Sequence, residues 1–191
     1  MKRKNKRKKF GRLLIRLFII IIAVYSIYYV SGEMKYIIYP IKYEEIVQKY
    51  SKEYNLDPLL LYAVIKVESS FDEKAISPKN ARGLMQIMPT TGKWIAEKLK
   101  DEKYNEEDLF EPTKNIMMGA WYINYLTEKF NGDTSLALMA YNAGPGNVQN
   151  WLLDENISSD GKKLDNVPYD ETAKYERKIM ESYKMYKKIY E

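Results

Sequence analysis

Apolar residues recur every three or four positions through most of residues 43–190, and this spacing constrains the fold more than any other feature of the sequence. It places apolar side chains on one face of an α-helix, whereas a half-buried strand would alternate apolar and polar residues. Breaks such as Ser77-Pro78 and Asn131-Gly132 separate the periodic segments. The sequence therefore predicts a mainly α-helical domain over residues 43–191.

The periodic segments and their flanking residues give the expected helix positions. We expect helices at 43–54, from Pro58 to about Phe71, from Thr90 to about Leu99, at 113–130, from Asp133 to about Tyr141 and at 169–190. A short side chain with an oxygen atom can accept hydrogen bonds from the first free N–H groups of a helix. On this basis the expected N-cap residues are Asp57, Thr113, Asp133 and Asp170.

The helix that begins at Pro58 carries a carboxylic acid on its apolar face. Leu61 and Val64 precede Glu68 by seven and four residues, so the three side chains share one face. The opposite, wetter face is expected to hold Tyr62, Lys66 and Ser69. Poor solvation favours a protonated carboxyl group and raises its pKa, as a general acid working near neutral pH requires. From this helix alone, a solvent-exposed glutamate at the helix end is an equal alternative.

The composition restricts the available chemistry, because the chain contains no Cys and no His. This excludes disulfides, thiolate metal sites, a cysteine nucleophile, Ser-His-Asp catalysis and zinc sites built on His. Carboxylates, hydroxyls, amides and tyrosines remain. We therefore expect neither a metal nor another cofactor.

Positive charge is concentrated at the N-terminus. Residues 1–30 contain nine basic and no acidic residues, so 31–191 holds 22 basic and 26 acidic residues and has a net charge of −4. A basic chain can indicate nucleic-acid binding. Because the positive charge is confined to the tail, we expect no nucleic-acid partner.

An apolar run, Leu17–Val30, follows the basic tail. Together with 13–15, and with Arg16 reaching the headgroups, it approaches the ~20 residues that span a bilayer. The flanking charge predicts a cytoplasmic tail at 1–12, a single transmembrane anchor at 13–31 in the cytoplasmic membrane, and an extracytoplasmic remainder. A cleaved signal peptide is the alternative, although no clear small-x-small cleavage site follows the run. Residues 32–42 are interpreted as a juxtamembrane linker.

Two loops carry residues suited to a ligand site. The turn-rich stretch 72–82 returns to Gly83 and Gln86, and it forms either a cleft wall near Glu68 or a polar surface loop. Tyr141-Asn142 precedes the break Gly144-Pro145-Gly146. An aromatic face and an amide suit the C–H groups, hydroxyls and acetamido groups of a sugar. A helix end followed by turn residues is the alternative for this segment.

Five sequence blocks occur in a fixed order. They are Glu68-Ser69-Ser70-Phe71, Gly83-Leu84-Met85-Gln86-Ile87-Met88-Pro89, Asn115-Ile116 with Gly119, Ala140-Tyr141-Asn142-Ala143-Gly144, and Glu171-Thr172 with Tyr175. In order and spacing they resemble the motifs of the lytic transglycosylase family, in particular its soluble-lytic-transglycosylase type. The resemblance covers about residues 44–190. The sequence departs from the family's pattern at Ala173, because many members have Arg directly after the Thr.

The resemblance implies a lysozyme-like helical domain at 43–191 with a glycan cleft. The implied substrate is peptidoglycan, cut at the β-1,4 bond between N-acetylmuramic acid and N-acetylglucosamine. Glu68 is then the only catalytic carboxylate and acts as acid, then as base. By the same resemblance Gln86, Tyr141 and Tyr175 line the cleft around the scissile bond, and Ser69, Met85 and Asn142 border it.

The residues fit a reaction in which one acid acts twice, because no second acid lies in a setting comparable to that of Glu68. The expected product carries a 1,6-anhydro ring that forms without water. A hydrolytic muramidase of the goose-lysozyme kind is one alternative. A domain that binds peptidoglycan without cutting it, as part of an envelope machine, is another.

Overall fold

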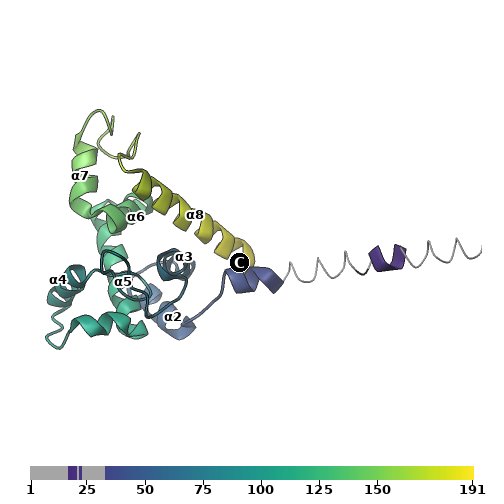
Figure 1. Cartoon of the computed structure of the whole chain (residues 1–191). Helices are drawn as coiled ribbons and strands as arrows, with labels where there is room; N and C mark the ends of the chain where they lie inside the picture. Colours follow the sequence, from purple (N-terminus) through teal and green to yellow (C-terminus); the bar gives the residue numbers. More distant parts are fainter. Residues whose placement is uncertain (1–16, 21, 23–32) are drawn as a thin grey trace, which may run out of the picture. The chain divides into compact units, whose positions relative to one another are not determined.

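The computed structural model describes residues 17–20, 22 and 33–191 (Figure 1). Contacts divide the chain into two compact units, Met1–Pro40 and Ile41–Glu191. In the first unit the described residues 17–20, 22 and 33–38 are helical. The predicted cytoplasmic tail and most of the predicted anchor at 13–31 lie outside the described residues. Within the described part of the chain, no helix has the length and apolar character needed to cross a membrane.

The second unit is mainly helical, as the spacing of apolar residues predicted. Its elements are α2 (Glu44–Glu53), α3 (Pro58–Ser69), α4 (Pro89–Leu99), the 3-10 helix η1 (Glu106–Phe110), α5 (Pro112–Lys129), α6 (Thr134–Ala143), α7 (Pro145–Leu153) and α8 (Asp170–Tyr190). The long loop between α3 and α4 contains two isolated antiparallel bridges, Ile76 with Arg82 and Arg82 with Ile87.

Two of the predicted N-caps are confirmed. The Asp57 carboxylate accepts a hydrogen bond from the Leu59 N–H, and Asp133 caps α6 in the same way. Two predictions were wrong. Helix α5 begins at Pro112, before Thr113, because proline already has the φ of a first helical residue and needs no N–H partner. Asp170 lies inside the first turn of α8 and is therefore not the N-cap residue. Its negative charge there stabilises the helix through the helix dipole.

Two elements were not predicted from the sequence. The 3-10 helix η1 is five residues long, too short to show a helical period, and a capping box between Asn105 and Asp108 begins it. Helix α7 starts at Pro145, which the sequence interpretation treated as part of a break. The preceding Gly144 adopts a positive φ of 87° and ends α6, so one short segment ends one helix and starts the next.

Helix α3 lies in the core and packs against α2 and α8. Leu61 and Val64 are fully buried, as its apolar face predicted. The prediction that Tyr62 faces solvent was wrong, because α8 covers that side of the helix. Its ring is 1% exposed and packs 5.8 Å from the ring of Tyr186. Helix α3 is therefore enclosed on more of its circumference than its sequence indicated.

A buried amide fixes the loop that follows α3. Asn115 on α5 is 0% exposed, and its Oδ1 accepts a hydrogen bond from the Met85 N–H at 2.7 Å. Its Nδ2 donates to the carbonyls of Arg82 at 3.0 Å and Leu109 at 2.7 Å. Gly83 passes against this amide with a φ of 73°, and a Cβ there would lie 2.1 Å from the Leu109 carbonyl oxygen.

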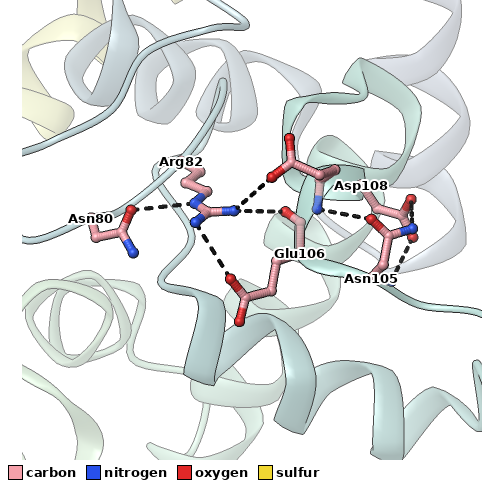
Figure 2. A network of polar contacts seen from close by, with 6 residues as sticks. Asn80, Arg82, Asn105, Glu106 and Asp108 are labelled. Atoms are coloured by element: carbon pink, nitrogen blue, oxygen red, sulfur yellow. Dashed lines mark hydrogen bonds and ion pairs between the residues drawn. The ribbon is translucent and has the colours of Figure 1, made fainter.

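A charged network holds the outer side of the same loop, as Figure 2 shows. Arg82 donates to the Asn80 side chain at 3.3 Å and forms ion pairs with Glu106 and Glu107, both at 3.4 Å. Because η1 carries both acids, the network ties the loop to the segment just before α5. Exposed ion pairs contribute little singly, so the buried Asn115 is the stronger of the two attachments.

We predict that Gly83→Ala destabilises the protein by roughly 2 kcal/mol or more, because the added methyl group meets backbone and the φ is strained for alanine. Gly146→Ala is the matched control, since a Cβ at Gly146 meets nothing within 4 Å. Urea unfolding of both variants measures the difference. Equal stabilities for the two variants would contradict this account of the loop.

Candidate functional site

The candidate site is centred on Glu68 in the last turn of α3. Ser70 and Phe71 follow with positive φ values of 52° and 66°, so the chain turns away directly after the helix. The Glu68 carboxylate is partly exposed and accepts a hydrogen bond of 2.5 Å from the Tyr175 hydroxyl on α8. The two residues are 107 positions apart in the sequence. The acid is therefore held where two packed helices meet.

Burial raises the pKa of Glu68 from 4.5 to about 7, and the hydrogen bond from Tyr175 acts in the opposite direction. Burial dominates because a charged carboxylate loses more hydration than one hydroxyl returns. The rise agrees with the position of Glu68 on the apolar face. Near neutral pH both protonation states of this group are well populated, which suits a group that first donates and then accepts a proton.

Two buried tyrosine hydroxyls flank this carboxyl group. Burial and the charge of Glu68 raise the pKa of Tyr141 and of Tyr175 well above 10. Both therefore stay protonated and can donate hydrogen bonds, but neither can act as a base near neutral pH. Tyr141 on α6 donates to the Met85 carbonyl at 2.8 Å. Its hydroxyl is thus used to attach α6 to the loop between α3 and α4.

The loop is also attached to the end of α3. The Ser69 hydroxyl donates to the Leu84 carbonyl at 2.8 Å, next to the residue that Tyr141 contacts. Gln86 is partly exposed and has a positive φ of 48°. Its Nε2 donates to the carbonyls of Gly83 at 2.9 Å and Ala75 at 3.1 Å. These bonds fix the direction of the Gln86 amide.

Met85 lies differently from the expectation that it borders a glycan. It is 0% exposed and sits beneath Gly119, where a Cβ would lie 2.3 Å from the Met85 sulfur. Its N–H binds Asn115 and its carbonyl binds Tyr141. Met85 therefore positions other groups through its backbone. In a loop without periodicity, the sequence cannot indicate which side chains point inward.

Asn142 is exposed, and its Oδ1 accepts a hydrogen bond of 2.9 Å from the Thr172 hydroxyl on α8. Thr172 is 1% exposed and lies one turn before Tyr175. The sequence interpretation placed Thr172 in a motif but gave it no role. The structure thus joins Glu68 to Tyr175 directly, and Ser69, Tyr141 and Asn142 each attach one of the surrounding segments.

A group of aromatic residues beside Tyr141 was missed in the sequence. The Tyr122 ring on α5 lies 5.4 Å from the Tyr141 ring and packs against Trp94 and Tyr125. Trp121 packs against Trp94 and Tyr125 in turn. Trp121 and Tyr125 are four residues apart on α5, a spacing that puts two large rings on one partly exposed face. That spacing was the available signal. The sequence interpretation assigned these aromatic residues no role.

No cluster of three or more acidic, His or Cys side chains that could hold a metal occurs in the described ranges 17–20, 22 and 33–191. The site itself offers the carboxyl group, the hydroxyls and the amides named above.

Comparison with known proteins identifies the family. The sequence model described as the Transglycosylase SLT domain matches residues 45–164. The chain belongs to this family. The match contains Glu68, Gln86, Tyr141 and the loop attachments, while Tyr175 lies beyond its end. The family that the sequence blocks predicted, of the lysozyme-like superfamily, is confirmed.

Individual relatives agree with this assignment of the SLT domain. The soluble lytic murein transglycosylase of Salmonella typhimurium is 31% identical over 144 residues, covering 74% of this chain and 22% of the relative. Membrane-bound lytic murein transglycosylase C of Actinobacillus pleuropneumoniae serotype 5b is 35% identical over 116 residues, covering 56% of this chain and 32% of the relative.

The fold agrees as well. A solved structure of an inactive mutant of lytic transglycosylase Slt from Pseudomonas aeruginosa superposes with a TM-score of 0.69 at 30% identity, covering 78% of this chain and 24% of that one. The SLT domain described above thus corresponds to about a quarter of the length of the soluble relatives it matches.

We predict that the stabilising effect of Glu68, relative to Glu68→Gln, falls as the pH rises from about 4.5 to about 7. The raised pKa means that the folded protein holds a proton which the unfolded chain has already released. This contribution is complete below the unfolded pKa and is lost above the folded one, a change of roughly 3 kcal/mol.

Urea unfolding of both proteins at pH 4.5 and pH 8 measures this change. Glu45→Gln, at an exposed position on α2, serves as the matched control. A difference between wild type and Glu68→Gln that stays constant over this range would contradict the raised pKa.

Proposed function

We propose that this chain is a peptidoglycan lytic transglycosylase. It cleaves the β-1,4 bond between N-acetylmuramic acid and N-acetylglucosamine and leaves 1,6-anhydro-N-acetylmuramic acid ends. Membership of the SLT domain family supports the reaction class. The observation that carries the proposal is the single carboxyl group of Glu68, whose pKa of about 7 and bond to Tyr175 suit a group that acts as acid and base in turn.

The neighbouring acids support a mechanism with one carboxylate. Glycosidases commonly use two carboxylates, one as acid and one as nucleophile or base. Asp72 is exposed and accepts a hydrogen bond from the Lys74 N–H at 2.9 Å. Glu73 accepts one from the Tyr43 hydroxyl at 3.1 Å. Among the described residues neither acid is a cause of the Glu68 pKa shift. Glu68 therefore acts in both steps.

In the first step, protonated Glu68 donates its proton to the glycosidic oxygen. The bond from the anomeric carbon to that oxygen breaks, and the N-acetylglucosamine end leaves with a hydroxyl group. The N-acetyl group of the muramic acid stabilises the positive charge that develops at the anomeric carbon. Tyr175 stabilises the carboxylate that results, because its hydroxyl already donates to the Glu68 Oε1.

In the second step, the Glu68 carboxylate accepts the proton of the sugar's own 6-hydroxyl, and the oxygen of that hydroxyl bonds to the anomeric carbon. This closes the 1,6-anhydro ring and restores protonated Glu68. Attack by a tethered hydroxyl has a high effective molarity compared with water. Gln86 and Tyr141 line the cleft in this proposal, and Ser69 and Asn142 border it. Met85 contributes through its backbone.

We also propose that residues 13–31 anchor the domain in the cytoplasmic membrane with the catalytic domain outside. The charge and length of the apolar segment support this, and one relative of the SLT domain is named as membrane-bound. We predict that the full chain stays in the membrane pellet after alkaline carbonate extraction. It should move to the supernatant when Ile19 and Ile22 are both changed to Asp. Wild-type chain in the supernatant would contradict the anchor.

Digestion of purified peptidoglycan by the full chain tests the reaction. We predict anhydro-muropeptides by mass spectrometry from wild type and from the control Asp72→Asn, and a loss of at least about 100-fold with Glu68→Gln, which removes the proton donor. Products heavier by one water would instead make the protein a hydrolytic muramidase. Glycan binding without cleavage by wild type would make it a binding module.

A further inference from the structure

Three large apolar side chains are exposed on the short helix at 33–38, which precedes the unit Ile41–Glu191. Met34 is 44% exposed, Ile37 is 73% exposed and Ile38 is 48% exposed. In the unit Ile41–Glu191, which is described throughout, the exposed large apolar residues are far apart in the sequence: Ile76, Met88, Leu153 and Tyr169. Single exposed apolar residues are normal, whereas a local concentration of them marks an interaction surface.

The three side chains share one face of the helix. Positions 34, 37 and 38 have the spacing i, i+3 and i+4, which aligns side chains on one side. We call this face, made by Met34, Ile37 and Ile38, the apolar stripe. Lys35 and Tyr36 lie about 100° and about 160° from Met34 around the helix axis. The Lys35 Nζ lies 4.8 Å from the centroid of the Tyr36 ring. The helix is therefore amphipathic.

The place of the helix in the sequence indicates what the apolar stripe contacts. The apolar run Leu17–Val30 ends three residues before Glu33, so at most about 11 Å of chain separates the run from the helix. With that run in the bilayer, the helix stays at the membrane surface. Lysine and tyrosine, which occupy the other side of the helix, are suited to the headgroup region. Both reach and chemistry therefore favour a lipid surface as the partner.

The charged residues of the helix favour a position on the membrane over one within it. Glu33 and Lys35 flank Met34, and a span that continued through the helix would carry both charges into hydrocarbon, which is costly. A helix that lies in the plane of the interface keeps both charges in water while its apolar face enters the boundary of the acyl chains.

We propose that the apolar stripe rests on the outer surface of the cytoplasmic membrane, with Met34, Ile37 and Ile38 directed toward the acyl chains. This inference rests on the membrane anchor proposed above and adds a second membrane contact between the anchor and the catalytic domain.

The proposed contact also limits how far the catalytic domain extends from the membrane. Ile38 and Tyr43 are five residues apart, so at most about 18 Å of chain joins them. The Tyr43 hydroxyl donates to the Glu73 carboxylate at 3.1 Å, and Glu73 lies five residues after Glu68. A stripe on the membrane therefore keeps the loop that follows Glu68 near the membrane surface.

Spin labelling of the full chain tests the proposal, and the absence of Cys means that each introduced cysteine reports on one position. Met34, Tyr36, Ile37 and Ile38 are changed to Cys one at a time, labelled and reconstituted in vesicles of phosphatidylcholine and phosphatidylglycerol in equal amounts. Electron paramagnetic resonance measures the access of oxygen, which concentrates in lipid, and of a nickel chelate, which stays in water. Gln48→Cys, at an exposed position on α2, is the matched control.

We expect the ratio of oxygen access to chelate access at 34, 37 and 38 to exceed that of Gln48→Cys at least about threefold, because these labels enter the acyl boundary. Tyr36→Cys, on the other side of the helix, should resemble Gln48→Cys. Labels at 34, 37 and 38 that also resemble Gln48→Cys would refute the contact. High oxygen access at all four positions would place the helix inside the bilayer, and low access of both reagents would mean that protein covers the stripe. Either result overturns the proposal.

The same vesicles separate this proposal from those on which it rests. A wild-type chain that alkaline carbonate removes from the vesicles refutes the anchor and the stripe together. A chain that is retained but carries water-exposed labels at 34, 37 and 38 refutes the stripe alone. None of these measurements uses peptidoglycan, so the proposed reaction is decided separately by the digestion described above.

Discussion

The arrangement of the site depends on one partly buried polar contact, the hydrogen bond from Tyr175 to Glu68. It joins the end of α3 to the start of α8, the two helices that pack together in the core. Burial raises the pKa of the carboxyl group, and the tyrosine moderates the rise. Without α8 the end of α3 would be solvated, and Glu68 would be an ordinary surface acid.

The surrounding segments are fixed mainly by backbone contacts. Tyr141 donates to the carbonyl of Met85, Ser69 donates to the carbonyl of Leu84, and Asn115 holds the loop from beneath. Buried amides and hydroxyls that are fully bonded stabilise one arrangement, since an unpaired group would cost on the order of 1–3 kcal/mol. These contacts therefore fix the loop, even though it lacks regular secondary structure.

Local patterns predicted much of the fold, and contacts between distant segments explain the rest. Apolar spacing placed Glu68 on the buried face, and Asp57 and Asp133 marked two helix starts correctly. The same spacing could not show that α8 would cover Tyr62, because that contact joins residues far apart in the sequence. The burial of Met85 could not be predicted either. Met85 lies in a loop held by Asn115, and the loop sequence has no periodic pattern that shows which side chains point inward.

The central claim is that this fold keeps one carboxyl group partly protonated near neutral pH. The most direct test is a carbon-13 NMR titration of the Glu68 carboxyl carbon in the wild-type chain, assigned by its loss in Glu68→Gln. The account predicts a midpoint near pH 7, which follows from burial beside Tyr175. A midpoint near the ordinary value of 4.5 would contradict it and would leave Glu68 unable to serve as both acid and base.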